Sequence, residues 1–142
     1  MMAEDLYQEA LLTKARSAIG AGTLGERADS RVTVDNPLCG DRITLELSRE
    51  GDRVGAIAHK VRGCILCQAA AALIAEQAPG QTRGDLTAAE DAARALLAGG
   101  VPPAGAWTGL AIFTPVAAHK SRHQCVLLPF EALRRAFDEA GL

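Results

Sequence analysis

The stretch from Arg31 to Ser48, RVTVDNPLCGDRITLELS, decides the fold. Polar and β-branched residues alternate from Arg31 to Asp35, and apolar and polar residues alternate again from Ile43 to Ser48. A two-residue period of this kind is typical of a strand with one buried face. Residues 36–40, NPLCG, combine three residue types that favour turns. The stretch therefore predicts two strands joined by a turn that carries a cysteine.

A third strand and several helices are expected in the rest of the chain. Glu50-Gly51-Asp52 is good turn chemistry, and the mostly apolar run from Val54 to Val61 predicts a strand that returns antiparallel. Helical spacing of apolar residues, or a run of good helix formers, predicts helices in four segments: 6–19, 64–77, 85–98 and 125–140. The second of these is nearly all Ala, Leu, Ile and Cys, so we expect it to be largely buried.

Proline and glycine limit what the remaining segments can form. Residues 99–105, GGVPPAG, are too rich in Gly and Pro for anything but a loop. Residues 107–118 stay ambiguous because Pro115 would break or kink a helix, and Pro129 fits the last helix only near its first turn. Three strands and several helices indicate an α+β fold. We expect a small three-stranded antiparallel sheet packed against the helices, in a single domain that spans residues 1–142.

Composition excludes several classes of protein and directs attention to the cysteines. The 142 residues include 15 Lys plus Arg and 17 Asp plus Glu, a net charge of -2 that argues against a general nucleic-acid or anionic-membrane binder. The longest nearly apolar stretch, residues 64–78, is shorter than the ~20 residues that span a bilayer. The acidic start of the chain is unlike a secretory signal, so we expect a cytoplasmic protein. Thiols stay reduced there, and four cysteines then favour metal or sulfur chemistry over disulfides.

Three of the cysteines lie in turns or at helix starts, where thiolates are available for chemistry. Cys39 and Asp41 flank Gly40, which lets a thiolate and a carboxylate face one point. Cys64 lies at the predicted start of a helix, where the helix dipole favours the thiolate, and Cys125 begins the last helix. With Asp41, these three cysteines would supply four ligands for zinc or most of the shell of an iron-sulfur cluster.

Other interpretations of the same residues remain open. Cys64 and Cys67 form a Cys-x-x-Cys pair after a strand, the outline of a thioredoxin-like redox site, although that site would leave Cys39, Asp41 and Cys125 without a role. Cys67 could also be a small packing residue or a fifth ligand.

The histidines and nearby basic residues add few candidates. His59 is expected to be a hydrogen-bonded strand residue at the surface or half-buried rather than a ligand, and His123 is the spare ligand. Lys120 and Arg122 are either a solvated loop or charges that lower the pKa values of neighbouring cysteines.

Three segments together resemble the U-type iron-sulfur cluster assembly proteins, the family of IscU, SufU and the NifU N-terminal domain. They are DNPLCGDRI from Asp35, GCILC from Gly63, and RHQC from Arg122 leading into Ala132-Leu133. The resemblance runs from about Leu6 to Ala140. It implies an α+β fold with a small sheet packed on helices, as in SufE- and IscU-like proteins, and a metal site at one end. The residues that match the family's ligands are Cys39, Asp41, Cys64 and Cys125.

Within this family the chain is most similar to the SufU branch. Cys64 and Cys125 are 61 positions apart, and the IscU branch is shorter there. Gln124 stands where the IscU branch has a histidine, and Arg122 matches an arginine that SufU-type members have near the metal. Many members also carry a His-x-x-Pro-type segment after the first helix, which residues 14–22 lack.

The resemblance to SufU implies a zinc-bound sulfur acceptor. It would take persulfide sulfur from a SufS-like cysteine desulfurase and pass it to downstream iron-sulfur assembly proteins. Cys39 is the predicted acceptor because its turn should move more easily than the helix starts that hold Cys64 and Cys125, and Arg122 is the supporting charge. Such a protein would be a zinc-dependent sulfurtransferase or a carrier without enzymatic turnover. The alternatives are a scaffold for a [2Fe-2S] cluster and a thiol redox protein using Cys64 and Cys67.

Overall fold

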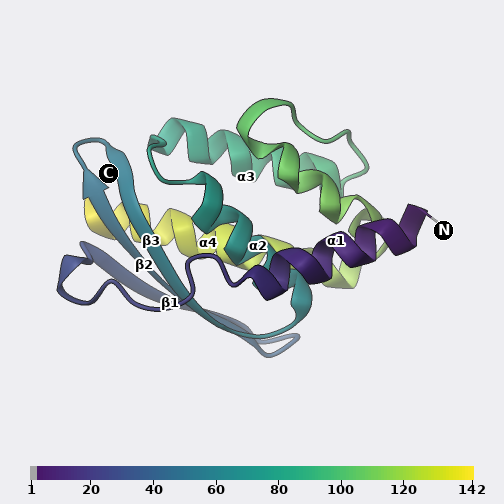
Figure 1. The fold of residues 1–142 in the computed structure, drawn as a ribbon, viewed down its shortest axis with the longest axis horizontal. Coiled ribbons are helices and arrows are strands. Elements are labelled where there is room, and N and C mark those ends of the chain that lie inside the picture. The colour runs from purple at the N-terminus through teal and green to yellow at the C-terminus, as the bar shows by residue number, and fades with distance from the viewer. Residues whose placement is uncertain (1–2) are drawn as a thin grey trace.

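The computed structural model describes residues 3–142, with side chains from Tyr7 onward (Figure 1). Three strands form one antiparallel sheet in the order β1-β2-β3: β1 (Ser30–Asn36), β2 (Asp41–Glu50) and β3 (Arg53–Arg62). Val32 lies opposite Leu45 and Val34 opposite Ile43 in the register, so the apolar residues of both strands share one face. These residues are buried. The three predicted strands and their antiparallel pairing are confirmed.

The four predicted helices are also present, with small differences at their ends. They are α1 (Ala3–Ser17), α2 (Ile65–Gln77), α3 (Arg83–Leu97) and α4 (His123–Ala140). Helix α3 begins two residues earlier than expected because Thr82 caps it and exchanges hydrogen bonds with Asp85. Three 3-10 segments complete the fold: η1 (Gly25–Arg27), η2 (Gly105–Ala118) and η3 (Lys120–Arg122). The ambiguous residues 107–118 lie in η2, and residues 99–104 form the predicted loop.

The helices cover the apolar face of the sheet in layers (Figure 1). Helix α4 packs on β1 and β2, and α2 packs on β3, while α1 lies against α2. Helix α3 contacts α4 and η2, farther from the sheet. The alanines of α2 from Ala69 to Ala72 are at most 1% exposed, and small side chains let the surrounding elements approach closely. The prediction that this helix is largely buried is confirmed.

Pro129 differs from its expected position. It is the seventh residue of α4, beyond the first turn, and is itself buried. A proline has no N–H, so the carbonyl of Cys125 lacks the hydrogen bond that residue 129 would otherwise donate to it. Most of α4 is buried against the sheet and α2, and this packing outweighs the lost bond.

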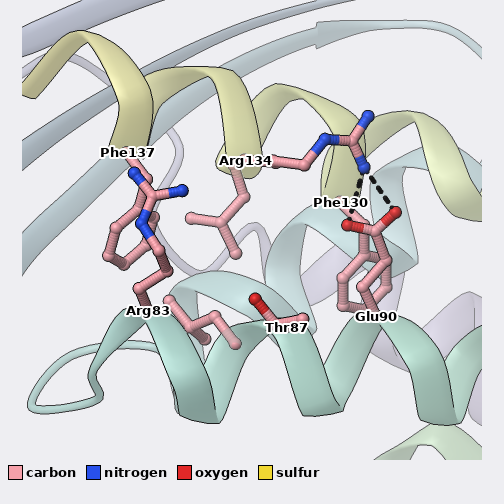
Figure 2. A pocket seen from close by; sticks show the side chains of 8 residues that line it. Arg83, Thr87, Glu90, Phe130, Arg134 and Phe137 are labelled. Carbon is pink, nitrogen blue, oxygen red and sulfur yellow. Dashed lines mark hydrogen bonds and ion pairs between the residues drawn. The ribbon is translucent and has the colours of Figure 1, made fainter. Parts of the chain in front are cut away.

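Helices α3 and α4 are joined by a charged cluster around a buried carboxylate. Figure 2 shows that Arg134 of α4 donates to both oxygens of Glu90. The two N···O distances are 2.9 and 2.6 Å, and Arg94 binds the same carboxylate at 2.9 Å. Beside this cluster, Arg83 lies over the ring of Phe137 at 5.6 Å. The cleft between these side chains holds a cavity of only about 20 Å³. We therefore interpret this pocket as a helix–helix contact rather than a ligand site.

Glu46 of β2 forms hydrogen bonds that hold the segment between α1 and β1 against the outer face of the sheet. Its carboxylate, 3% exposed, accepts hydrogen bonds from the Thr23 hydroxyl at 3.0 Å and the Leu24 N–H at 3.4 Å. Arg31 adds an ion pair at 2.6 Å. Burial alone would raise the pKa of Glu46, but the bonds from Thr23 and Arg31 keep it below its ordinary value.

Replacing Glu46 should destabilise the protein because three donors would lose one buried acceptor. For Glu46→Ala we expect a loss of about 1–3 kcal/mol in the free energy of unfolding, measured by urea denaturation. Glu50→Ala is the control, since Glu50 is exposed at the end of the same strand. Equal stability of the two variants would show that the Glu46 contacts contribute nothing.

His59 connects β3 to the segment that follows α1. Its ring Nε2 donates to the Ile19 carbonyl at 2.7 Å, and its backbone exchanges bonds with Gly20 and Gly22. Its Nδ1 is buried and has no hydrogen-bond partner within the described part of the chain. Burial lowers the pKa of His59, only partly opposed by the bond to Ile19. The predicted hydrogen bonding of this strand histidine is confirmed, but its side chain is buried, 5% exposed, rather than at the surface or half-buried.

The lowered pKa of His59 predicts that acid weakens the fold. The unfolded chain binds a proton near pH 6.5 more readily than the folded chain does, so this contribution to stability is present above about pH 6.5 and is lost as the pH falls below it. Urea denaturation at pH 7.5 and 5.5 should show a smaller acid loss for His59→Gln than for the unchanged protein. The same loss in both would assign the acid sensitivity to other groups.

Candidate metal centre

The turn between β1 and β2 presents Cys39 at the surface. The side-chain Oδ1 of Asn36 accepts a hydrogen bond from the Leu38 N–H at 3.1 Å, and the backbone carbonyl of Asn36 accepts one from the Gly40 N–H at 2.8 Å. Gly40 has a φ of 76°, a left-handed conformation that glycine adopts without strain. The two bonds to Asn36 define the shape of the turn and leave the side chain of Cys39 exposed.

Asp41 is the first residue of β2 and is buried, 3% exposed. Its Oδ1 accepts the backbone N–H of Cys64 at 3.0 Å, and its Oδ2 lies 3.6 Å from the Cys64 sulfur. A Cβ atom at position 63 would overlap the carboxylate of Asp41. A glycine is therefore required before Cys64 for Asp41 to occupy this position.

Cys64 and Cys125 are held at the starts of two helices. Cys64 is the N-cap residue of α2, with extended backbone, and is half-buried. Cys125 is the third residue of α4 and is 1% exposed. Its sulfur lies 3.6 Å from that of Cys39, although the two residues are 86 positions apart. The ligand atoms of Cys39, Asp41 and Cys125 all lie within 4.8 Å of one another, and Cys64 joins them through Asp41.

The charges of this cluster depend on one another. Burial would raise the pKa of Asp41, but hydrogen bonds from Cys39, the Cys64 N–H and Cys125 lower it below its ordinary value. Burial, followed by the hydrogen bond with Cys39, raises the pKa of Cys125. Arg122 is exposed at the rim, and hydrogen bonds with Cys64 and then Cys125 raise its pKa. Arg122 thus supplies the positive charge of the cluster.

The structure brings together all five residues of the predicted site: Cys39, Asp41, Cys64, Cys125 and Arg122. Cys67 lies behind them, fully buried in the hydrophobic core, where burial and the neighbouring Asp41 raise its pKa. This position favours a packing role over a ligand or half of a redox pair. The imidazole Nε2 of His123, the expected spare ligand, instead lies 3.1 and 3.2 Å from the Val116 and Ala117 carbonyls.

The donor set fits zinc. Thiolates are soft ligands that select Zn²⁺ or iron-sulfur clusters, and a carboxylate is a harder ligand that zinc also accepts. Three thiols and one carboxylate match the four ligands of tetrahedral zinc in number and kind. Cys39, Asp41, Cys64 and Cys125 are thus the residues that could hold the metal.

Two supporting residues were not assigned a function from the sequence. Gly63 is part of the GCILC segment in the sequence, and in the structure it follows the end of β3 and lies close to Asp41, the first residue of β2. Asn36 was noted only as a turn residue, and its two hydrogen bonds shape the turn of Cys39. The signal that could have found Gly63 is a glycine directly between a strand and a helix-starting cysteine, where a small residue allows close approach.

Comparison with known proteins gives the family. A model of the NifU-like N terminal domain matches residues 6–126. The chain belongs to this family. A NifU-like protein (N-terminal) from Brucella abortus has the same fold, with a TM-score of 0.90, 32% identity, and 99% of this chain and 98% of that chain covered. The fold also matches a putative iron-sulfur cluster assembly scaffold protein for the SUF system from Fervidobacterium islandicum, with a TM-score of 0.83, 23% identity, and 94% and 98% covered.

Curated relatives of this NifU-like chain carry the name iron-sulfur cluster assembly scaffold protein IscU. The one from Thermotoga maritima is 27% identical over 98% of this chain and 97% of its own length. The one from Streptococcus pyogenes is 28% identical over 78% of this chain and 70% of its own length. A protein of nearly the same length is thus named IscU, so chain length alone does not separate the branches of the family.

The contact between Gly63 and Asp41 predicts an effect on metal affinity. In Gly63→Ala the new methyl group would displace the Asp41 carboxylate, and we expect a loss of about tenfold or more in zinc affinity, because outer-shell changes commonly have effects of this size. Competition with a chromogenic chelator would measure it. Gly84→Ala is the matched control, because its nearest neighbour, the Thr82 hydroxyl, is 3.8 Å away. Unchanged affinity in Gly63→Ala would rule out a role for Asp41 in binding.

Proposed function

We propose that this NifU-like protein functions in iron-sulfur cluster assembly, as an acceptor of persulfide sulfur from a cysteine desulfurase. The observation that carries the proposal is the meeting of three thiols, a buried carboxylate and Arg122 at one end of the sheet, with one thiol, Cys39, exposed. The sulfur would then pass to downstream assembly proteins. Free thiols require a reducing compartment, which supports a cytoplasmic location.

Cys39 is the residue that we propose accepts the sulfur. Its thiolate attacks the outer sulfur of the donor's persulfide, a new S–S bond forms on Cys39, and the bond within the donor persulfide breaks. The donor cysteine leaves as a thiolate with the bonding electron pair, so the transfer needs no external oxidant or reductant. Exposure of Cys39 gives a protein donor access, whereas Cys125 is 1% exposed.

The other residues of the centre support this transfer. Zinc, held by Cys39, Asp41, Cys64 and Cys125, would keep the thiols deprotonated at neutral pH. Arg122 lies against Cys64 and Cys125 and stabilises anionic sulfur. Asp41 holds the start of α2 through the Cys64 N–H, so the cluster keeps its shape while the turn of Cys39 moves.

A second candidate is the scaffold on which a [2Fe-2S] cluster is assembled. The names of the relatives from Thermotoga maritima and Streptococcus pyogenes favour it, because both are called assembly scaffolds. Three cysteines and one carboxylate also suit a cluster that must leave, since a carboxylate is a more exchangeable ligand than a fourth thiolate. Gln124, in place of the histidine of the IscU branch, and Arg122 favour the sulfur-acceptor branch instead.

Metal analysis separates these functions. Protein purified anaerobically without a metal-binding tag should contain about one zinc per chain and no colour if it is a sulfur acceptor. Iron, acid-labile sulfide and a brown spectrum would identify the scaffold. Protein without metal would favour the thiol redox alternative.

Replacing Cys39 should abolish sulfur transfer. After incubation with a cysteine desulfurase and L-cysteine, mass spectrometry should find the mass of one added sulfur on a peptide containing Cys39, and Cys39→Ala should lack it. Cys67→Ala is the control because it removes a cysteine that lies in the core. Sulfur on Cys39→Ala at the level of the unchanged protein would remove Cys39 from the role of acceptor.

A further inference from the structure

An apolar groove opens directly beside the cysteine cluster. It has a volume of about 380 Å³ and is formed by α1, the first turn of α2 and the end of η2. Its apolar walls are Leu11, Leu12, Ile65, Leu66, Pro115 and Val116. Ile65 is the residue that follows Cys64, and Arg122 also lines the groove, so the groove and the cluster share an edge.

Exposed apolar side chains are the sequence neighbours of two of the thiols. Leu38, next to Cys39 in the turn, is 91% exposed, and Ile65, next to Cys64, is 42% exposed. The side chain of Leu38 projects from the same turn as Cys39, and its backbone N–H donates to the side chain of Asn36. Exposed apolar surface of this kind, grouped around a chemical site, is typical of an interface that closes on binding.

The described rim of the groove carries positive charge. Arg122 lines it, Lys120 is exposed two positions away in the sequence, and no carboxylate occurs among the lining residues whose side chains the structure describes, from Tyr7 onward. A partner that fills the groove must therefore present an apolar side chain, and a carboxylate beside it would meet the cationic rim.

We propose that this groove is the docking site for the protein that donates the persulfide, through a segment with an apolar side chain next to a carboxylate. The inference rests on the proposed function and adds the surface that recognises the donor. Leu38, the neighbour of Cys39, inserts into the donor's surface. The two apolar contacts then exclude water around the sulfur atoms while Cys39 reaches the donor persulfide.

Substitutions in the groove test the proposal with a cysteine desulfurase as the donor. Leu12→Glu places a negative charge in the apolar wall, and we expect the half-saturating desulfurase concentration for sulfur transfer to rise about tenfold or more. Ile65→Glu, at an already exposed residue, is a second variant in case Leu12→Glu does not fold, which circular dichroism would show. The matched control is Val101→Glu, because Val101 is an 84% exposed apolar residue in the loop before η2.

A small donor separates failure of the groove from failure of the proposed function. Transfer from glutathione persulfide needs no protein docking, so the defect of Leu12→Glu should be confined to the desulfurase reaction. Groove variants that match Val101→Glu with the desulfurase would overturn the docking site. A groove-dependent dimer of this chain, found by sedimentation and lost in Leu12→Glu, would also overturn it. If the unchanged protein takes sulfur from neither donor, the sulfur-acceptor function itself is wrong.

Discussion

The hydrogen bond from the Cys64 N–H to the Asp41 carboxylate is the contact on which the rest of the centre depends. It joins the start of β2 to the start of α2 and uses a backbone donor that would otherwise lack a partner at the end of a helix. Asp41 can remain ionised in a buried position because this donor and the neighbouring thiols surround it. The close fit against Gly63 leaves the carboxylate little freedom to move.

Burial divides the four proposed ligands into three that are packed into the structure and one that is exposed. Cys125 and Asp41 lie in the interior, Cys64 is half-buried at a helix cap, and Cys39 alone is exposed. A buried ligand can leave its position only if packed structure moves with it, whereas a turn at the surface can shift at a smaller cost in free energy. The same division places the exposed ligand between Leu38 and the apolar groove.

Local patterns in the sequence were sufficient for the elements but not for every contact between them. The alternation in residues 31–48 predicted the strands because burial of one sheet face imposes a period of two. The expectation that Pro129 lies near the first turn of the last helix was wrong. Helix propensity does not include tertiary packing, and the packing of α4 outweighs the hydrogen bond that the proline removes. The secondary structure of residues 107–118 could not be predicted for a similar reason. The segment forms 3-10 turns that accommodate Pro115 and is partly buried.

The site was predictable in composition because the resemblance to a family connected cysteines far apart in the chain. The contacts that support the site were not predictable, because they join residues that are far apart in the sequence and belong to no common repeating pattern. The proximity of Gly63 to Asp41 depends on the pairing of β2 with β3. The hydrogen bonds of His123 depend on where η2 ends, and they direct its imidazole to backbone carbonyls rather than to a metal.

The separation of Cys39 and Cys125 by 86 positions has a consequence for the unfolded chain. A link between the two sulfurs encloses most of the polypeptide in one loop. For a covalent cross-link, closing a loop of this size raises the free energy of the unfolded chain by about 4–5 kcal/mol, because the chain loses conformational entropy. A metal ion that binds both residues would therefore reduce the conformational entropy of the unfolded chain as well as change the chemistry of the sulfur atoms. Binding of such an ion would therefore be linked thermodynamically to folding and would add to the stability of the folded chain.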